Sequence, residues 1–243
     1  MIAYRLHFEA LNLAAMDLAR RGQLGKLKFF NSSFSMTVRR GDIRTKREYG
    51  GGTLYDIGVY CINAARNLFR AEPTQVSAVS INSGLATLAE IDETTAATLR
   101  FGDDQVATFV NSFNAADVAA YRIVGTKGHL HADPAYEYAE GLEYALTIDG
   151  KTTKKSIGKR DQFAPELLYF SDCILNDREP EPSGDEGLQD VRIVQALYRS
   201  AQTGRPVAIR PFQKRIRPTS RQRTTRPGVR KPALIKVQSA SRD

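Results

Sequence analysis

An acid and a tyrosine lie four residues apart in residues 50–61, which read GGGTLYDIGVYC and are otherwise mostly apolar. At this spacing Asp56 and Tyr60 would lie on one face of a helix. A carboxylate buried without partners is costly, so Asp56 needs a reason to be there. The phenol beside it could exchange a proton with a substrate hydroxyl, provided that a nearby cation stabilises its deprotonated form. The alternative is structural: Asp56 caps the start of the helix and Tyr60 packs in the core.

Three consecutive glycines, residues 50–52, precede this pair and admit two interpretations. They could let the backbone approach a ligand closely and leave N–H groups free at a helix start. They could equally form a tight turn from loop to helix without a ligand. The run does not match a dinucleotide-binding fingerprint, because no G-x-G-x-x-G follows a strand and no acid follows about 20 residues later in a βαβ unit.

Two further groups of residues could contribute to a substrate site. Asp161, in the sequence RDQF before a predicted helix, could reach a cleft or cap the helix, and its position favours the cap. Aromatic residues of the predicted sheet could line a sugar site, although sheet-face packing is the more ordinary role for such residues: Tyr136, Tyr138 and Tyr144.

No pattern predicts a metal site. His129 and His131 are two apart, so on a strand they point the same way, and Asp133 continues that face. The trio lacks a recognised ligand spacing, which favours ordinary strand histidines. The two cysteines, Cys61 and Cys173, lie in unrelated contexts without C-x-x-C spacing and are expected to be buried, reduced thiols.

The elements that would position these residues follow an α+β order rather than repeated βαβ units. Periodicity near 3.6 predicts helices over 12–25, 53–70, 164–177 and 187–204. Alternation predicts strands over 1–8, 26–36, 74–83, 93–101, 105–114, 120–126, 128–133 and 143–149. The stretch TLRFGDDQVATF reads as a hairpin with a Gly-Asp-Asp turn.

We therefore expect a large, mostly antiparallel sheet from residue 26 to about 157, with helices on one face and the other face open. An open apolar face is unfavourable in water, so this arrangement predicts a homodimer or higher oligomer through the sheet.

The length of 243 residues allows one large domain or two small ones with a sizeable core. No run of about 18 apolar residues exists, which excludes a predicted membrane-spanning helix. The start, MIAYRLHFEAL, lacks the pattern of a signal peptide, so the sequence indicates a cytoplasmic protein.

The net charge of +8 belongs to the C-terminal segment. Residues 210–243 hold eleven Lys or Arg, one acid and four prolines, and read as disordered. Residues 1–209 are near neutral, at −2. The segment would bind phosphates at low salt, but Phe212 is its single aromatic residue and it contains no recognisable module, so nucleic-acid binding is the least favoured hypothesis.

Residues 50–69, GGGTLYDIGVYCINAARNLF, resemble the signature of the glucose–fructose oxidoreductase and myo-inositol dehydrogenase (Gfo/Idh/MocA) family. In that family a glycine-rich turn leads into a helix that carries Asp and, four residues on, His or Tyr. Three other segments are similar to the end of the family's nucleotide domain, its G-T-x-G strand pair and its closing helices: residues 3–25, 121–138 and 160–207. The resemblance covers roughly residues 1–209.

The resemblance implies three parts: a remnant of a dinucleotide-binding domain (1–25), an α+β substrate and oligomerisation domain (26–209) and a basic disordered tail (210–243). It also implies NAD or NADP as cofactor and hydride transfer to or from a carbon that bears a sugar hydroxyl. Tyr60 matches the proton-donating position and Asp56 the acid that faces substrate hydroxyls. Arg5 matches a strand beside the nicotinamide, and we take it with Asp161 as a substrate-binding candidate.

The sequence departs from the family in one respect. The Rossmann domain, with its glycine-rich phosphate loop and the lysine of its E-K-P motif, does not occur in these 243 residues. We therefore expect this chain to bind NAD(P)H weakly or not at all. Whether the chain is an enzyme stays open between three hypotheses: the substrate-binding and dimerisation domain of an NAD(P)-dependent oxidoreductase of sugars or related alcohols, a truncated, non-catalytic oligomerisation module, and a nucleic-acid-associated protein.

Overall fold

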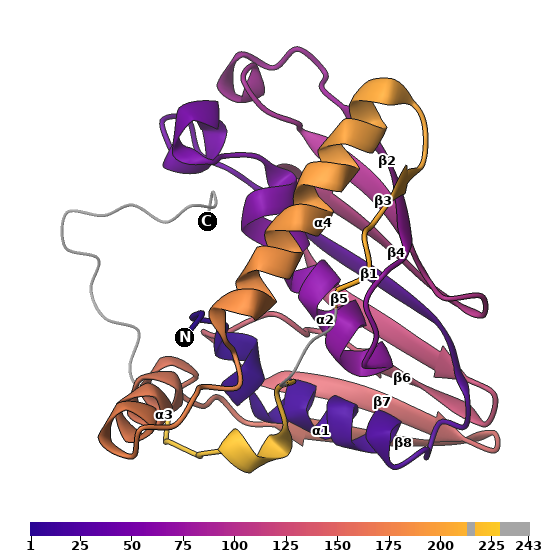
Figure 1. Cartoon of the computed structure of the whole chain (residues 1–243), viewed down its shortest axis with the longest axis vertical. Helices are drawn as coiled ribbons and strands as arrows, with labels where there is room; N and C mark the ends of the chain where they lie inside the picture. The colour runs from indigo at the N-terminus through magenta and orange to yellow at the C-terminus, as the bar shows by residue number, and fades with distance from the viewer. Residues whose placement is uncertain (213–216, 229–243) are drawn as a thin grey trace.

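A single sheet of nine strands forms the body of the protein in the part that the computed structural model describes, residues 1–212 and 217–228 (Figure 1). The strand order is β8-β7-β6-β5-β1-β4-β3-β2-β9. β1 and β4 run parallel, and the other neighbouring pairs run antiparallel. The predicted α+β fold with a mostly antiparallel sheet is confirmed.

The strands are β1 (Leu27–Thr37), β2 (Gln75–Ile81), β3 (Thr94–Phe101), β4 (Gln105–Ser112), β5 (Asn114–Gly125), β6 (Gly128–Ala132), β7 (Leu142–Ile148), β8 (Lys151–Ile157) and β9 (Val207–Ala208). The α-helices are α1 (Ala10–Arg20), α2 (Val59–Phe69), α3 (Phe163–Leu175) and α4 (Gly184–Thr203). Shorter helical turns are η1 (Arg5–Phe8), η2 (Ile43–Thr45), η3 (Arg47–Tyr49), η4 (Leu54–Gly58), η5 (Ala86–Leu88) and η6 (Ser220–Gln222). β3 and β4 form the predicted hairpin.

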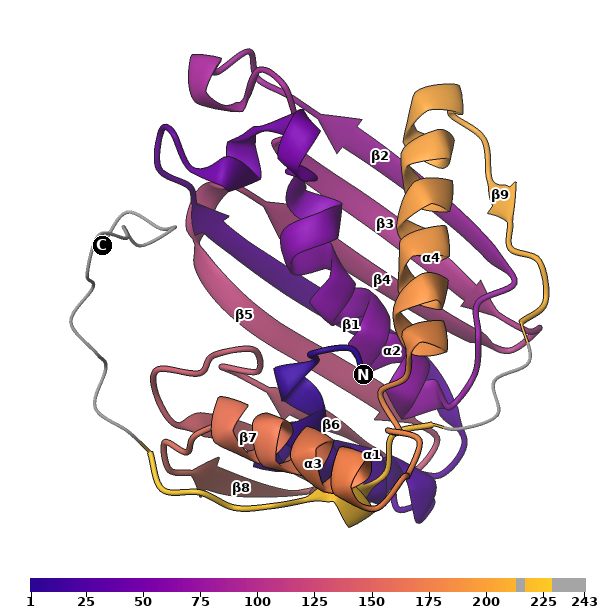
Figure 2. The same cartoon turned by 60° about the vertical axis from the view of Figure 1, so that its left-hand side comes forward.

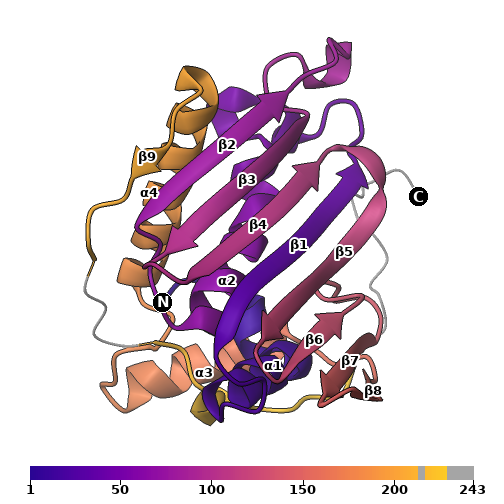
Figure 3. The ribbon, with the colours of Figure 1, turned by 90° about the vertical axis from the view of Figure 1, so that its right-hand side faces the viewer.

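The helices α1, α2 and α4 cover one face of the sheet, and α3 lies on the same side, farther out and against η1 (Figures 1 and 2). Figure 3 shows the opposite face bare. The alternation of β4 explains this division, because Ala107 and Phe109 are buried under the helices while Val106 and Val110 point outward. Val79 of β2 is 66% exposed on the bare face.

The strand predicted for residues 1–8 is wrong. The segment lies on the helical side of the sheet, packed against α1 and α3, and forms the 3-10 turn η1. There it has no strand beside it among the described residues, and local bonds such as His7 N–H to the Tyr4 carbonyl satisfy its backbone. Glu9 caps α1 by accepting from the N–H groups of Leu11 and Asn12, both at 2.7 Å.

The sequence pattern does not predict β8, whose residues read KTTKKSI. This strand lies at the edge of the sheet and its side chains are almost all exposed, so no apolar alternation marks it. Lysines on an edge strand discourage pairing with another chain.

The described residues of the C-terminal segment contact the body, in contrast to the disorder expected for 210–243. Arg217 pairs with Glu72, and Pro227 forms a β-bridge with Arg160. Residues 213–216 and 229–243 of that segment lie outside the described residues. None of the helices within the described ranges has the length and apolar character needed to cross a membrane.

Candidate active site

A cleft of about 220 Å³ brings together three of the four predicted site residues. It is lined by the N-terminal segment and by the helical stretch of η4 and α2: Ala3, Tyr4, Arg5, Leu6, Asp56, Val59, Tyr60 and Asn63. The stretch from Leu54 to Phe69 is continuously helical, with a π turn at its start. The i, i+4 spacing therefore places Asp56 and Tyr60 on the same wall, as predicted.

The glycine run packs a loop tightly against the start of this helix. A Cβ atom on Gly51 would lie 2.4 Å from the carbonyl oxygen of Arg44 and 2.6 Å from that of Lys46. Gly52 has a φ of 118°, and its Cβ would lie 2.5 Å from the hydroxyl of Tyr198. The turn interpretation of the glycines is therefore the one that the geometry supports, and the turn packs the loop of η2 against the start of the helix that lines the cleft.

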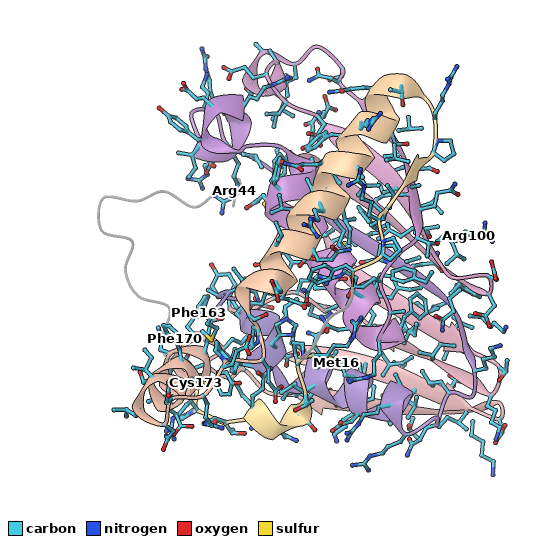
Figure 4. The ribbon with its side chains drawn as sticks, in the orientation of Figure 1. Met16, Arg44, Arg100, Phe163, Phe170 and Cys173 are labelled. Atoms are coloured by element: carbon cyan, nitrogen blue, oxygen red, sulfur yellow. The ribbon has the colours of Figure 1, made fainter. Side chains whose placement is uncertain are left out.

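Arg44 of this loop, labelled in Figure 4, pairs with Asp56. Its Nε donates to Asp56 Oδ2 at 2.8 Å, and its Nη1 lies 3.3 Å from Asp42 Oδ1. Burial raises the pKa of the Asp56 carboxyl, and the Arg44 guanidinium partly offsets that effect. The side chain of Asp56 remains 26% exposed, so it is accessible from the cleft.

The capping role considered for Asp56 belongs to another acid. The Thr53 N–H donates to Asp92 Oδ2 at 3.1 Å, and the Tyr198 hydroxyl donates to Asp92 Oδ1 at 2.8 Å. The carboxylate of Asp56 therefore does not cap the helix; it pairs with Arg44 and lines the cleft.

Arg5 is buried and held by two acceptors. Its guanidinium donates to Gln162 Oε1 at 2.6 Å and to the Tyr136 carbonyl at 2.5 Å. Its Cζ lies 5.0 Å from the centre of the Tyr60 ring and 5.2 Å from that of the Tyr138 ring. These distances suit cation–π contacts with both rings. A fixed positive charge therefore lies beside the ring of Tyr60.

Tyr60 is half-buried. Its ring packs against Phe34 and Tyr136, with centroid distances of 5.4 and 5.8 Å. Its hydroxyl forms no hydrogen bond within the described part of the chain, although the ring is well packed. The ring therefore packs against the core, as the structural alternative expects, and the hydroxyl is left without a protein partner among the described residues.

Asp161 lies apart from this cleft. Its carboxylate accepts from the N–H groups of Phe163 and Ala164, at 2.8 and 3.0 Å, and caps α3 as its sequence position favoured. Its neighbour Gln162 is the residue of this loop that reaches the site, through Arg5.

Three supporting residues, Arg44, Gln162 and Tyr136, come from distant loops. Tyr136 is fully buried, and its hydroxyl lies 2.8 Å from Ser32 Oγ. The spacing of these residues in the sequence does not predict that they support the site, because each contacts a cleft residue only in the folded structure. Cys61 and Cys173 are buried and unpaired, as expected. In the described ranges no group of three or more His, Cys, Asp or Glu side chains could hold a metal ion.

A family model described as the GFO/IDH/MocA C-terminal domain matches residues 12–131. The chain belongs to this family. Among its relatives, the D-xylose 1-dehydrogenase [NADP(+)] of Haloarcula marismortui is 29% identical over 211 residues, which are 84% of this chain and 58% of that protein. D-xylose 1-dehydrogenase (NADP(+)) 2 of Haloferax volcanii is 27% identical over 86% of this chain and 64% of its own length.

A solved structure, the aldose-aldose oxidoreductase of Caulobacter crescentus complexed with glycerol, superimposes with a TM-score of 0.81 and 34% identity. The match covers 86% of this Gfo/Idh/MocA chain and 63% of that one. This chain therefore spans about three fifths of the length of the relatives named here.

Proposed function

We propose that this chain is the substrate-binding and dimerisation domain of a nicotinamide-dependent oxidoreductase of sugars or related alcohols. The observation that carries the proposal is the meeting of Arg5, Asp56 and Tyr60 in one cleft. The names of the relatives, two NADP-dependent xylose dehydrogenases and an aldose-aldose oxidoreductase, support a sugar as the substrate class. The proposed domain comprises residues 26–209, between a closing segment of a nucleotide domain (1–25) and the basic tail (210–243).

The cleft residues would handle the proton and the hydroxyl groups of the substrate. In its deprotonated form the Tyr60 oxygen would take the proton that leaves a substrate hydroxyl when its carbon is oxidised, and in the reverse direction the Tyr60 hydroxyl would return that proton. Arg5, over the ring, would stabilise the negative charge that the phenolic oxygen carries before it accepts the proton. Asp56 would accept a hydrogen bond from a neighbouring hydroxyl, with Arg44 holding its carboxylate in place.

The described residues do not fit the phosphates of a dinucleotide. Such phosphates bind free N–H groups at a helix start. The amides at the start of α1 already donate to Glu9, those of α3 to Asp161, and the N–H of Thr53 before η4 to Asp92. The first turn of α4 carries two acids, which would repel a phosphate. The nicotinamide cofactor would therefore be held by a separate nucleotide-binding domain.

An apolar stripe on α3 suits that domain. Exposed side chains recur there at spacings of four, three and four residues, which place them on one helix face: Phe163, Leu167, Phe170 and Ile174. Figure 4 shows Phe163 and Phe170 on the side of the molecule away from the sheet. The stripe leads toward the cleft, because Phe163 contacts the ring of Tyr138, which in turn packs against Arg5 of the cleft lining. A domain docked on this stripe would lie beside the cleft.

A second copy of the chain would cover the bare sheet face. Its exposed valines and isoleucine lie on β2, β4 and β5, which alternate with β3 and β1 in the sheet, and exposed apolar side chains of this kind mark a protein interface: Val79, Ile81, Val106, Val110 and Val118. One observation favours the alternative function, a non-catalytic pairing module: the N–H groups at the helix starts described above already donate to carboxylates and are not free to bind a cofactor phosphate. The nucleic-acid hypothesis gains no support from Arg217, because its cation is already paired with Glu72 within the chain.

The activity of a chimera distinguishes the catalytic domain from the non-catalytic pairing module. This chain replaces the matched part of the Haloarcula marismortui xylose dehydrogenase, and turnover is measured with D-xylose and NADP⁺. Tyr60→Phe should lower turnover by roughly 10²–10⁴-fold, the usual worth of positioned proton transfer, with a change in stability of only about 1 kcal/mol. Asp56→Asn, which keeps the shape and removes the charge, should also lower turnover without unfolding the helix.

Tyr55→Phe is the matched control, because it removes a hydroxyl from the same helix outside the cleft lining. If Tyr60→Phe turns over like Tyr55→Phe, Tyr60 is core packing and the catalytic assignment fails. The isolated chain should bind NADP⁺ weakly or not at all in isothermal titration.

A further inference from the structure

The described end of the C-terminal segment, residues 217–228, forms a strap along α1 and α3, drawn in yellow in Figures 1 and 2. Its bonds to the body come from several side chains. Ser220 Oγ donates to Asp17 Oδ1 at 3.1 Å, and the Thr219 N–H donates to Glu181 Oε2 at 2.6 Å. Two other strap residues, Arg217 and Gln222, lead to opposite ends of η1.

Arg217 reaches the start of η1 through a chain of ion pairs. Its Nη2 donates to Glu72 Oε1 at 2.9 Å, and Glu72 Oε2 accepts from Arg66 Nε at 2.7 Å. Arg66 pairs in turn with Asp190. The Tyr4 hydroxyl donates to Asp190 Oδ2 at 2.5 Å, and Tyr4 is the residue immediately before η1.

This network is buried. The side chain of Arg66 is 0% exposed and that of Asp190 is 1% exposed. Glu186 also lies within ion-pair distance of Arg66. The network therefore contains two cations, Arg66 and Arg217, and three carboxylates: Glu72, Glu186 and Asp190. Removing Arg217 would leave one arginine for three acids, of which Glu186 and Asp190 are buried and Glu72 is part-buried, and a buried charge that loses its partner is strongly unfavourable.

Gln222 reaches the other end of η1. Its side chain is buried, at 3% exposure, and its Nε2 donates to the His7 carbonyl at 2.9 Å. η1 is a 3-10 turn of four residues, and such a short helical segment has little stability of its own. The strap thus holds this turn at both ends.

We propose that Arg217 and Gln222 are positioning residues for Arg5: the strap clamps η1 and so sets the Arg5 guanidinium over the ring of Tyr60. The catalytic meaning of that position rests on the proposed function, but the clamp itself is a property of this chain alone. It assigns to the basic tail a role in shaping the cleft rather than in binding nucleic acid.

The clamp can be tested on the full chain by hydrogen–deuterium exchange read by mass spectrometry. Arg217→Ala and Gln222→Ala should speed the exchange of a peptide covering residues 1–9 by about tenfold or more. Each variant loses one hydrogen bond, to the Glu72 carboxylate or to the His7 carbonyl, and a change of about tenfold is the usual effect of such a loss. Peptides from β1 and β4 should keep their wild-type rates. The controls are Arg226→Ala, with the same change of charge in an exposed strap residue, and Gln202→Ala on the exposed face of α4.

Two further readouts distinguish positioning from simple loss of stability. Arg217→Lys keeps a cation beside Glu72 and should restore most of the protection. In NMR spectra the guanidinium resonances of Arg5, assigned with Arg5→Lys, should move in Arg217→Ala and Gln222→Ala, because the guanidinium leaves the two aromatic rings.

The loosening in Arg217→Ala should also depend on pH. Burial already raises the pKa of Asp190, and it lowers the pKa of Arg217. The groups that face the network are Tyr4 from the N-terminal segment, Arg66 and Asn63 from α2, Glu186 from α4, and Arg70 and Glu72 after α2. Without Arg217 a carboxyl must take up a proton to relieve the excess negative charge, so the variant-to-wild-type ratio of exchange rates should be larger at pH 8 than at pH 5.5.

Equal exchange of residues 1–9 in Arg217→Ala, Gln222→Ala and the two controls overturns the proposal. Acceleration that is uniform across η1, β1 and β4 also overturns it, since it would show loss of global stability alone. Failure of the chimera to oxidise D-xylose would leave the exchange result unchanged, so the two proposals fail separately.

Discussion

Replacing Gly52 by alanine should destabilise the protein far more than replacing Gly50, although the two glycines are two residues apart. Gly50 has a φ of 75°, and a Cβ atom there would meet nothing within 4 Å. Gly52 has a φ of 118°, and its Cβ would lie 2.5 Å from Tyr198 Oη and 2.7 Å from Asp92 Oδ1. Both substitutions strain the backbone, but only the second also displaces the carboxylate that caps the helix.

The magnitudes follow from these two contributions. Left-handed backbone costs an alanine about 1–2 kcal/mol, so Gly50→Ala should lower the free energy of unfolding by about 1 kcal/mol. Gly52→Ala adds the loss of the Tyr198 or Thr53 hydrogen bond to Asp92, worth about 1 kcal/mol, and greater strain at its less accessible φ. We expect about 2–4 kcal/mol in total. For a chain of this size each kcal/mol shifts Tm by about 2–4 °C, so Tm should fall by roughly 5–15 °C.

The measurement is thermal and urea unfolding of both variants, followed by far-ultraviolet circular dichroism at one protein concentration. Gly51→Ala is a useful third variant, because its Cβ would meet two backbone carbonyl oxygens that cannot rotate away. If Gly50→Ala and Gly52→Ala melt within 2 °C of each other, close approach is not what requires glycine at position 52. The link between the glycine run and the placement of Arg44 on Asp56 would then lose its support.

Two other predictions follow from the site and the sheet. Val79→Lys combined with Val110→Lys should convert a dimer into a monomer in sedimentation velocity at micromolar concentration, because both side chains lie on the bare sheet face; a wild-type monomer under these conditions would contradict the proposed interface. Asp56, whose pKa is raised by burial, contributes stability that is present below its ordinary pKa of about 4 and is lost as the pH rises through the raised value. Asp56→Asn, which mimics the protonated form, should therefore gain stability relative to wild type between pH 4 and pH 7 in urea unfolding, and a relative loss would show that Arg44 dominates instead.

The sequence alone determines most of the fold and the central pair of the site. Alternation in β1 to β7 is strong because one face of each strand is buried, and a period-2 pattern needs no knowledge of the neighbouring strand. The i, i+4 spacing of Asp56 and Tyr60 places them on one wall for an equally local reason. Local patterns do not predict the edge strand β8, because its side chains are almost all exposed and show no apolar alternation. They do not predict the turn η1 either, because its conformation depends on packing against α1 and α3.

The tertiary structure alone decides which partners complete the site. Arg44 is held against Asp56 by a glycine turn whose steric demand depends on Tyr198 and Asp92, far along the chain. Arg5 is fixed by Gln162, and the strap meets η1 through residues more than 200 positions away. Hydrogen bonds and ion pairs of this kind depend on distances of about 3 Å between side chains. Such distances arise only when the packed core brings remote segments together, so no local pattern of residue types records them.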